Sequence, residues 1–126
     1  MEKTVVVYGS LRKKDYNYSR IGMHNNTEFL GEGEIEGYKL YSLGMYPCIY
    51  PSKDKSDKVI VEVYNVNETT FNRIDWMEKG AGYTSKEENV KLDNGEEIKG
   101  TVYIYRTKPT EDRVIKGGDW IKYRGL

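Results

Sequence analysis

An alternating apolar and polar run that leads directly into a helical pattern constrains the fold of this sequence more than any other feature. Residues 59–66, VIVEVYNV, have the period of two that is typical of a β-strand. Residues 67–80, NETTFNRIDWMEKG, predict a helix with Asn67 as N-cap and Gly80 as the stop. Apolar residues recur in it at helical spacing: Phe71, Ile74 and Met77 or Trp76. One face of this helix must therefore lie on a sheet.

The rest of the chain consists of short segments separated by turn residues. The predicted strands are 5–8, 29–36, 38–42 and 47–50, with a polar connection at 51–58. Asn-Gly within DNG (93–95), between two β-rich runs, predicts a hairpin. Residues 19–24 predict a turn of helix or an ordered loop, and 114–126 a turn and a short helix anchored by Trp120. The sequence therefore predicts one α+β domain, residues 1–126, dominated by antiparallel strands.

Charge and hydropathy exclude several classes of function. The 20 Lys and Arg residues balance the 20 Asp and Glu residues and are dispersed along the chain. No net field therefore favours nucleic acid or an anionic membrane. The first ten residues do not resemble a signal peptide, and no apolar run approaches the roughly 18 residues of a membrane span. We therefore expect a cytoplasmic protein that binds neither nucleic acid nor membranes.

The sequence also lacks the common cofactor and metal motifs. It has no Walker loop, GxGxxG, HExxH, paired cysteines or calcium-loop spacing of acids. Cys48 in MYPCIY is predicted to be a buried structural thiol, because its catalytic alternative would need the one histidine, His24, as partner. His24 itself is predicted to be a loop residue rather than a ligand. The motif GEGEIEG (31–37) predicts a strand with solvated glutamates, so we expect no metal and no cofactor.

The first predicted strand ends in a turn that could bind a ligand oxygen. In VVVYGSLR (5–12), an apolar run passes straight into Gly9 and Ser10. Such a turn leaves backbone N–H groups pointing away from a ladder, where they can hold an anionic or carbonyl oxygen. The same pattern is also typical of an ordinary strand end, so the motif alone leaves both readings open.

The end of the predicted helix carries a carboxyl in an unusual place. Glu78 lies in the last turn, on the same face as Asp75, where the carbonyl end of the helix dipole raises the pKa of an acid. If Trp76, Met77 and tyrosines partly enclose it, Glu78 has the properties of a general acid/base near neutral pH. The alternative is a solvated surface glutamate.

These segments together resemble a known family. The sequence is similar to the gamma-glutamylcyclotransferase-like (AIG2-like) family from about Val5 to Tyr123, through six segments in the family's order: VYGSLR, EGYKLYSLGMYPCIY, VEVYNV, IDWMEKGAGY, DNGEEIKGTVYIY and GGDWIKY. YGSL alone is a weak motif, but the ordered set is specific. The resemblance implies a small mixed β-barrel with flanking helices.

The resemblance also implies a site and a reaction. The backbone amides of one loop would hold a γ-glutamyl group: Tyr8, Gly9, Ser10 and Leu11. Glu78 would be the catalytic acid/base, and Tyr83 would line the same pocket. The substrate would be a γ-glutamyl amine, amino acid or small conjugate, which cyclises to 5-oxoproline and releases the free amine without metal or cofactor.

The sequence departs from the family pattern at three positions. Lys79 follows the glutamate where glycine is usual and could pair with Glu78 and lower its pKa. Ser85 replaces a frequent arginine, and Val61 replaces a usual glycine before Glu62. These departures keep a second function open: a non-catalytic module that binds a small ligand in the same pocket, or a protein partner on its surface.

Two further expectations concern specificity and assembly. The segment 13–20 is predicted to contribute to specificity through Tyr16, Tyr18 and Arg20, with a solvated loop as the alternative. Exposed tyrosines permit a homodimer without requiring one.

Overall fold

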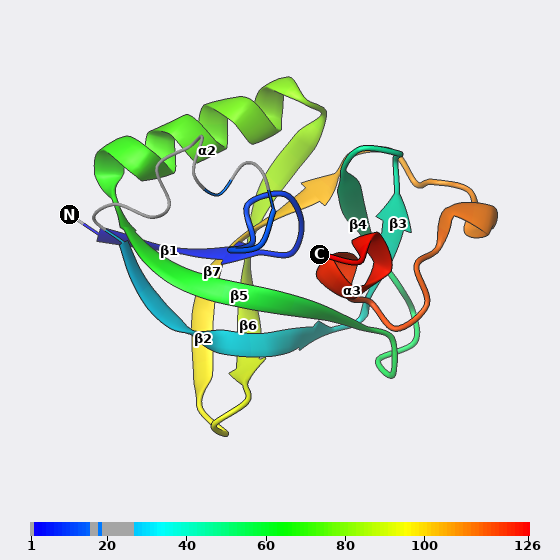
Figure 1. Ribbon diagram of the computed structural model, residues 1–126, viewed down its shortest axis with the longest axis horizontal. Coiled ribbons are helices and arrows are strands. Elements are labelled where there is room, and N and C mark those ends of the chain that lie inside the picture. The colour runs from blue at the N-terminus through cyan, green and yellow to red at the C-terminus, as the bar shows by residue number, and fades with distance from the viewer. Residues whose placement is uncertain (1, 16–17, 19–26) are drawn as a thin grey trace.

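The chain folds as a curved sheet with one long helix lying across it (Figure 1). The computed structural model describes residues 2–15, 18 and 27–126. Its elements are β1 (Glu2–Val7), β2 (Thr27–Glu36), β3 (Tyr38–Ser42), β4 (Pro47–Pro51), β5 (Lys58–Asn67), α2 (Glu68–Gly80), β6 (Tyr83–Leu92), β7 (Glu97–Tyr105), the 3-10 turn η1 (Glu111–Arg113) and α3 (Trp120–Arg124). The predicted α+β class is confirmed. The predicted segment 19–24 lies outside the described residues.

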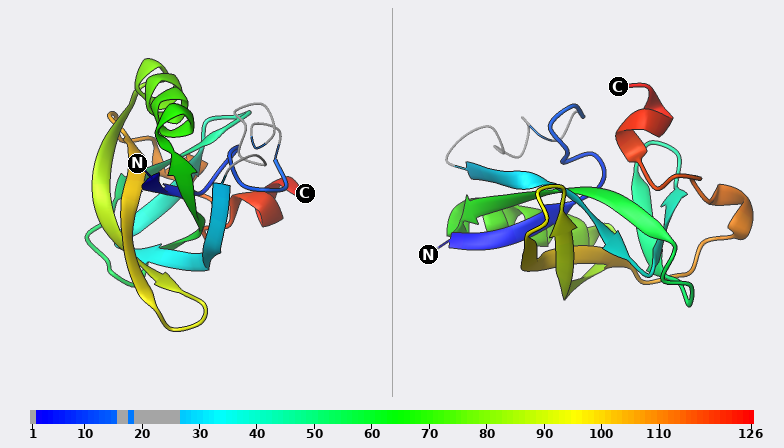
Figure 2. Two further views of the ribbon diagram at one scale, coloured as in Figure 1. Left: turned by 90° about the vertical axis from the view of Figure 1, so that its left-hand side faces the viewer. Right: turned by 90° about the horizontal axis from the view of Figure 1, so that it is seen from below.

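The main sheet has the strand order β1-β5-β2-β6-β7, and its neighbours pair in antiparallel fashion. The last strand returns to the first through one parallel pair, Val5 with Thr101. At this seam a Cβ atom on Gly100 would lie 2.9 Å from Val6 Cγ2, so glycine permits the close approach of β7 to β1. Figure 2 shows the strong curvature of these strands from two sides. Strands β3 and β4 form a separate hairpin.

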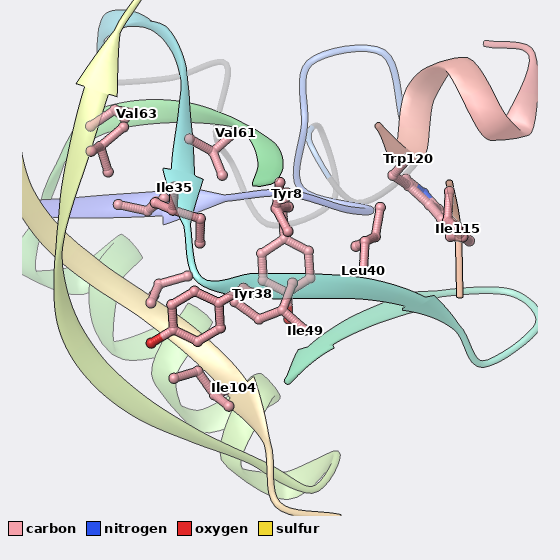
Figure 3. Packing of buried hydrophobic residues seen from close by; sticks show 14 of the residues in the cluster. Tyr8, Ile35, Tyr38, Leu40, Ile49, Val61, Val63, Ile104, Ile115 and Trp120 are labelled. Carbon is pink, nitrogen blue, oxygen red and sulfur yellow. The ribbon is translucent and has the colours of Figure 1, made fainter. Parts of the chain in front are cut away.

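The second half of β1 is buried on both faces of the sheet, which explains its continuous apolar run. Val6 belongs to the cluster inside the curved sheet, together with Val61 and Val63 of β5. Figure 3 shows Val61 and Val63 with Tyr8, Ile35, Trp120 and further members of that cluster. Val5 and Val7 point to the other face, where a second cluster includes Ile74 of α2. A strand covered on both sides needs apolar residues at every position rather than at alternate ones.

Helix α2 follows the predicted pattern closely. The side chain of Asn67 accepts a hydrogen bond from Thr70 N at 2.8 Å, which confirms the predicted N-cap. Ile74 is buried and Met77 packs against the second cluster, whereas Trp76 is 82% exposed. Met77, not Trp76, therefore continues the apolar face. Gly80 is the last helical residue, and the left-handed conformation that follows belongs to Gly82, with φ of 101°.

The hairpin and the tail are also as predicted. Gly95 has a φ of 93° and its N–H donates to Leu92 O at 3.0 Å, which makes the turn between β6 and β7. Trp120 is fully buried and anchors α3. Strand β2 lies between β5 and β6, and two of its glutamates form ion pairs: Glu34 with Lys58 at 3.2 Å and Glu32 with Arg12 at 3.5 Å.

Candidate active site

The loop after β1 packs tightly against β4. The chain leaves the sheet at Tyr8, and Arg12 N donates to Gly9 O at 2.9 Å to close a turn. A Cβ atom on Gly9 would lie 2.4 Å from Pro47 Cγ, so the loop backbone lies directly on the proline ring. The N–H groups of Gly9 and Leu11 donate to no acceptor in the part of the chain that the structure describes. They are therefore available to an oxygen of a bound molecule.

Glu78 supplies the carboxyl of the site. It lies in the last turn of α2 and is half-buried, and its side chain lines a cavity together with the loop after β1. Within residues 2–15, 18 and 27–126, no group forms a hydrogen bond or an ion pair with this carboxyl. Burial raises the pKa of Glu78 to about 7. A carboxyl with this pKa can both accept and donate a proton near neutral pH.

Three tyrosines fix the walls around Glu78 through hydrogen bonds that their hydroxyls donate. Tyr8 donates to Tyr103 O at 2.7 Å, and Tyr83 donates to Pro47 O at 2.6 Å. Tyr103 donates to Asp75 Oδ1 at 2.9 Å. Burial, reinforced by neighbouring acidic groups, raises the pKa of all three phenols well above the ordinary value. They therefore remain protonated and keep these hydrogen bonds at neutral pH.

The cavity has a volume of about 250 Å³. All six residues that the sequence assigns to a site line it: Tyr8, Gly9, Ser10, Leu11, Glu78 and Tyr83. No lysine, arginine or histidine of the described residues is among its lining groups. Its size lies slightly below the range of ~300–1,000 Å³ that is usual for small-molecule pockets. A small ligand therefore fits better than a polymer.

Sequence reasoning missed Tyr103, which lies on β7 and lines the same cavity. The hairpin register could have found it. Counting outward from the DNG turn pairs Ser85 with Tyr103 and Tyr83 with Tyr105, so Tyr83 and Tyr103 lie two positions apart on one face. The enclosure of Glu78 expected from Trp76 is wrong, because that side chain points into solvent, while the enclosure by Met77 and by tyrosines is confirmed.

The pairing of Lys79 with Glu78 that the sequence allowed does not form. Lys79 Nζ lies 3.0 Å from Asp75 Oδ2, one helical turn back. The raised pKa of Glu78 thus follows from burial, and the neighbouring lysine does not lower it. Ser85, the second departure from the family pattern, is exposed on β6.

Arg12 forms a buried network that the sequence did not indicate. Its Nε lies 2.8 Å from Glu62 Oε2 on β5, and its Nη1 lies 2.9 Å from Asp119 Oδ1 at the start of α3. Glu62 Oε1 also accepts from Tyr64 Oη at 2.8 Å and from Lys13 N at 2.9 Å. Burial alone would lower the pKa of Arg12, but Glu62 and Asp119 outweigh it and raise that pKa. The network ties the end of the loop to β5 and α3, which lie beside it in Figure 1.

Two further candidate residues in the described part of the chain, Cys48 and Tyr18, do not line the cavity. Cys48 is fully buried, and burial raises the pKa of its thiol to about 12, which confirms the predicted structural thiol. Tyr18 packs against Tyr64, with ring centroids 6.1 Å apart. Tyr16, Arg20 and His24 lie outside the described residues. In the described part of the chain, no cluster of His, Cys, Asp and Glu could hold a metal ion, and no helix is long and apolar enough to cross a membrane.

Replacing Gly9 by Ala is expected to destabilise the protein by about 1–3 kcal/mol, because the added methyl group would overlap Pro47 Cγ and Cδ, at 2.4 and 2.8 Å. Urea denaturation measures this loss. Gly80→Ala is the matched control, because nothing lies within 4 Å of a Cβ atom there and alanine favours the helix. If both variants are equally stable, the contact with Pro47 does not require a glycine at position 9.

The fold thus places a half-buried carboxyl and the loop after β1 around one small cavity. Comparison with known proteins identifies the family of this chain. The family model described as "Gamma-glutamyl cyclotransferase, AIG2-like" matches residues 5–122. The chain therefore belongs to the AIG2-like gamma-glutamyl cyclotransferase family, and this membership supports the general cyclotransferase class.

Individual relatives agree with this assignment. Protein MJ1514 of Methanocaldococcus jannaschii, a candidate gamma-glutamylcyclotransferase by name, is 34% identical over 96% of this chain and 98% of its own. The gamma-glutamylcyclotransferase family protein YtfP of Escherichia coli K12 is 30% identical over 93% and 95%. The crystal structure of protein PH0828 from Pyrococcus horikoshii matches with a TM-score of 0.74 and 34% identity over 97% of this chain and 92% of that one. The observed fold is thus that of the family.

Proposed function

We propose that this protein cyclises a γ-glutamyl amine, amino acid or small conjugate to 5-oxoproline and releases the free amine. The observation that carries the proposal is the Glu78 carboxyl: it is half-buried, has no partner among the described residues and lines one cavity with the loop Tyr8–Leu11. Family membership supplies the reaction class. The hydroxyls of Tyr8, Tyr83 and Tyr103 are engaged with backbone and Asp75, whereas the Glu78 carboxyl has a pKa suited to carry a proton.

The reaction uses a nucleophile that the substrate itself carries. The α-amine attacks the γ-carbonyl carbon, a new C–N bond closes a five-membered ring, and the amide C–N bond to the leaving amine breaks. Because the two reacting groups belong to one molecule, the protein contributes chiefly by folding the substrate within the small cavity. No redox step and no external nucleophile are required.

Glu78 and the loop divide the remaining tasks. Glu78 accepts a proton from the α-ammonium group, which creates the free amine, and returns this proton to the departing nitrogen as the amide C–N bond breaks. The regenerated carboxylate then accepts the second proton that the ring nitrogen loses, and this proton passes on to the released amine. The pKa of Glu78, about 7, suits these transfers. The N–H groups of Gly9 and Leu11 donate to the oxygen of the γ-carbonyl as negative charge develops on it.

Incubation with a panel of γ-glutamyl amino acids, γ-glutamyl amines and glutathione tests the proposal, with 5-oxoproline measured by mass spectrometry. We expect the wild type to release it from at least one compound faster than the compound cyclises alone. Glu78→Gln is the comparison variant. If the folded wild type binds these compounds and releases nothing, the protein is instead a ligand-binding module that uses the same cavity.

A further inference from the structure

Asp75 engages two groups beside Glu78 with its two carboxylate oxygens. It lies three residues before Glu78 on α2. Its Oδ1 accepts the hydrogen bond from the Tyr103 hydroxyl at 2.9 Å, and its Oδ2 lies 3.0 Å from Lys79 Nζ. Each oxygen is thus assigned to one partner, and these partners come from β7 and from the last turn of α2.

Either of these two partners would stabilise a Glu78 anion if its side chain turned towards that carboxyl. Tyr103 lines the same cavity as Glu78 and is electrostatically coupled to it. Lys79 is its neighbour in the chain. A hydrogen bond or an ion pair from either one to Glu78 would favour the ionised carboxyl and remove its capacity to carry a proton at neutral pH.

Several other titratable or charged groups near Glu78 are engaged elsewhere, while Tyr46, which is 39% exposed, lines the same cavity. Tyr8 at the end of β1 donates to Tyr103 O, and Tyr83 of β6 donates to Pro47 O. Arg106, which follows β7, donates to the backbone oxygen of Lys79 at 3.4 Å rather than to a carboxylate. With Asp75 and Lys79 neutralising one another, Glu78 meets nearly balanced charge on its own helix.

We propose that Asp75 is a positioning residue for Glu78, because it holds Lys79 and the Tyr103 hydroxyl away from the Glu78 carboxyl. The catalytic purpose of this positioning rests on the proposed function, whereas the contacts of Asp75 do not depend on it. It also explains how the chain carries a lysine directly after Glu78: the acid one turn earlier compensates for it.

Three variants separate the charge of Asp75 from its structural contribution. Asp75→Asn retains an oxygen that can accept from Tyr103 but leaves Lys79 without its ion-pair partner, and we expect the pKa of Glu78 to fall by about one unit. Lys79→Met leaves the Asp75 charge uncompensated, and the pKa of Glu78 should rise. The double variant Asp75→Asn/Lys79→Met should return it close to the wild-type value.

The pKa of Glu78 can be followed without turnover by ¹³C NMR titration of the glutamate side-chain carboxyls, with the Glu78 signal assigned by its absence in Glu78→Gln. The acidic limb of the pH profile of kcat/KM gives the same quantity in the working enzyme. Glu111→Gln, which breaks the exposed pair with Lys39, is the control and should shift neither.

Opposite shifts in the two single variants that cancel in the double variant support the positioning role. Shifts in the same direction, or no shift in either, overturn it even if the wild type releases 5-oxoproline. If the NMR shifts occur as expected and no γ-glutamyl compound is turned over, the proposed function fails while the positioning of Glu78 by Asp75 stands.

Discussion

Glu78→Gln is expected to lower 5-oxoproline release by about 100-fold or more and, at the same time, to stabilise the protein at alkaline pH. The loss of activity follows because glutamine cannot carry the proton between the two nitrogens, and general acid–base catalysis contributes roughly 10²–10⁴-fold. The gain in stability follows because burying an ionised carboxyl costs free energy, whereas a neutral amide of similar shape avoids that cost.

The pH dependence has a definite sign. The pKa of Glu78 in the folded protein, about 7, lies above its ordinary value of 4.5. Between these two values the folded state binds more protons than the unfolded state, so the wild type loses stability as the pH rises through this window. Glu78→Gln escapes this loss. The difference in the free energy of unfolding between Glu78→Gln and the wild type should grow from near zero below this pH window to at most about 3 kcal/mol above it.

Urea denaturation of both proteins at pH 5 and at pH 8 measures this difference. Glu97→Gln, at an exposed position of β7, is the control and should show no such growth with pH. An advantage of Glu78→Gln that is the same at both pH values would mean that the carboxyl is not desolvated, and its proposed role as proton carrier would lose its physical basis.

Local signals predicted most of the secondary structure. The N-cap at Asn67, the DNG turn and the period of two in β5 each depend on residues close in the chain, and each was found in the expected place. The strand order was not accessible in this way. Strand β5 lies between β1 and β2, and β7 returns to β1 at Gly100, because of contacts between residues far apart in the sequence.

The site shows the same division between features that local signals predict and features that depend on distant contacts. Helical spacing and the Gly-Ser turn singled out Glu78 and the loop as candidates, and the resemblance to the family implied their roles; the structure places both around one cavity. Spacing could also have excluded Trp76, because residues two apart do not share a helix face and Ile74 defines the buried one. The i,i+4 spacing of Asp75 and Lys79 could have predicted their ion pair. The network of Arg12 could not be predicted, since charge patterns do not reveal which polar side chains the fold will bury.

Arg12→Met is expected to destabilise the protein by about 3–5 kcal/mol, the usual cost of breaking a buried ion pair from one side. The side chains of Arg12 and Glu62 are only 4% and 8% exposed. Removal of the guanidinium leaves the Glu62 carboxylate buried beside Tyr64 without a cation. Urea denaturation at neutral pH measures the loss, and Lys39→Met, which breaks the exposed pair with Glu111, should cost far less.

The double variant Arg12→Met/Glu62→Met tests whether Arg12→Met loses stability because the ion pair is gone or because the Glu62 carboxylate is left buried without a cation. Since most of the cost of the single change is the unpaired buried carboxylate, removing that carboxylate as well should restore part of the stability. If Arg12→Met costs no more than Lys39→Met, the guanidinium is not the anchor of the loop. The contact of Gly9 with Pro47 and the burial of Leu11 would then hold it in place by packing alone.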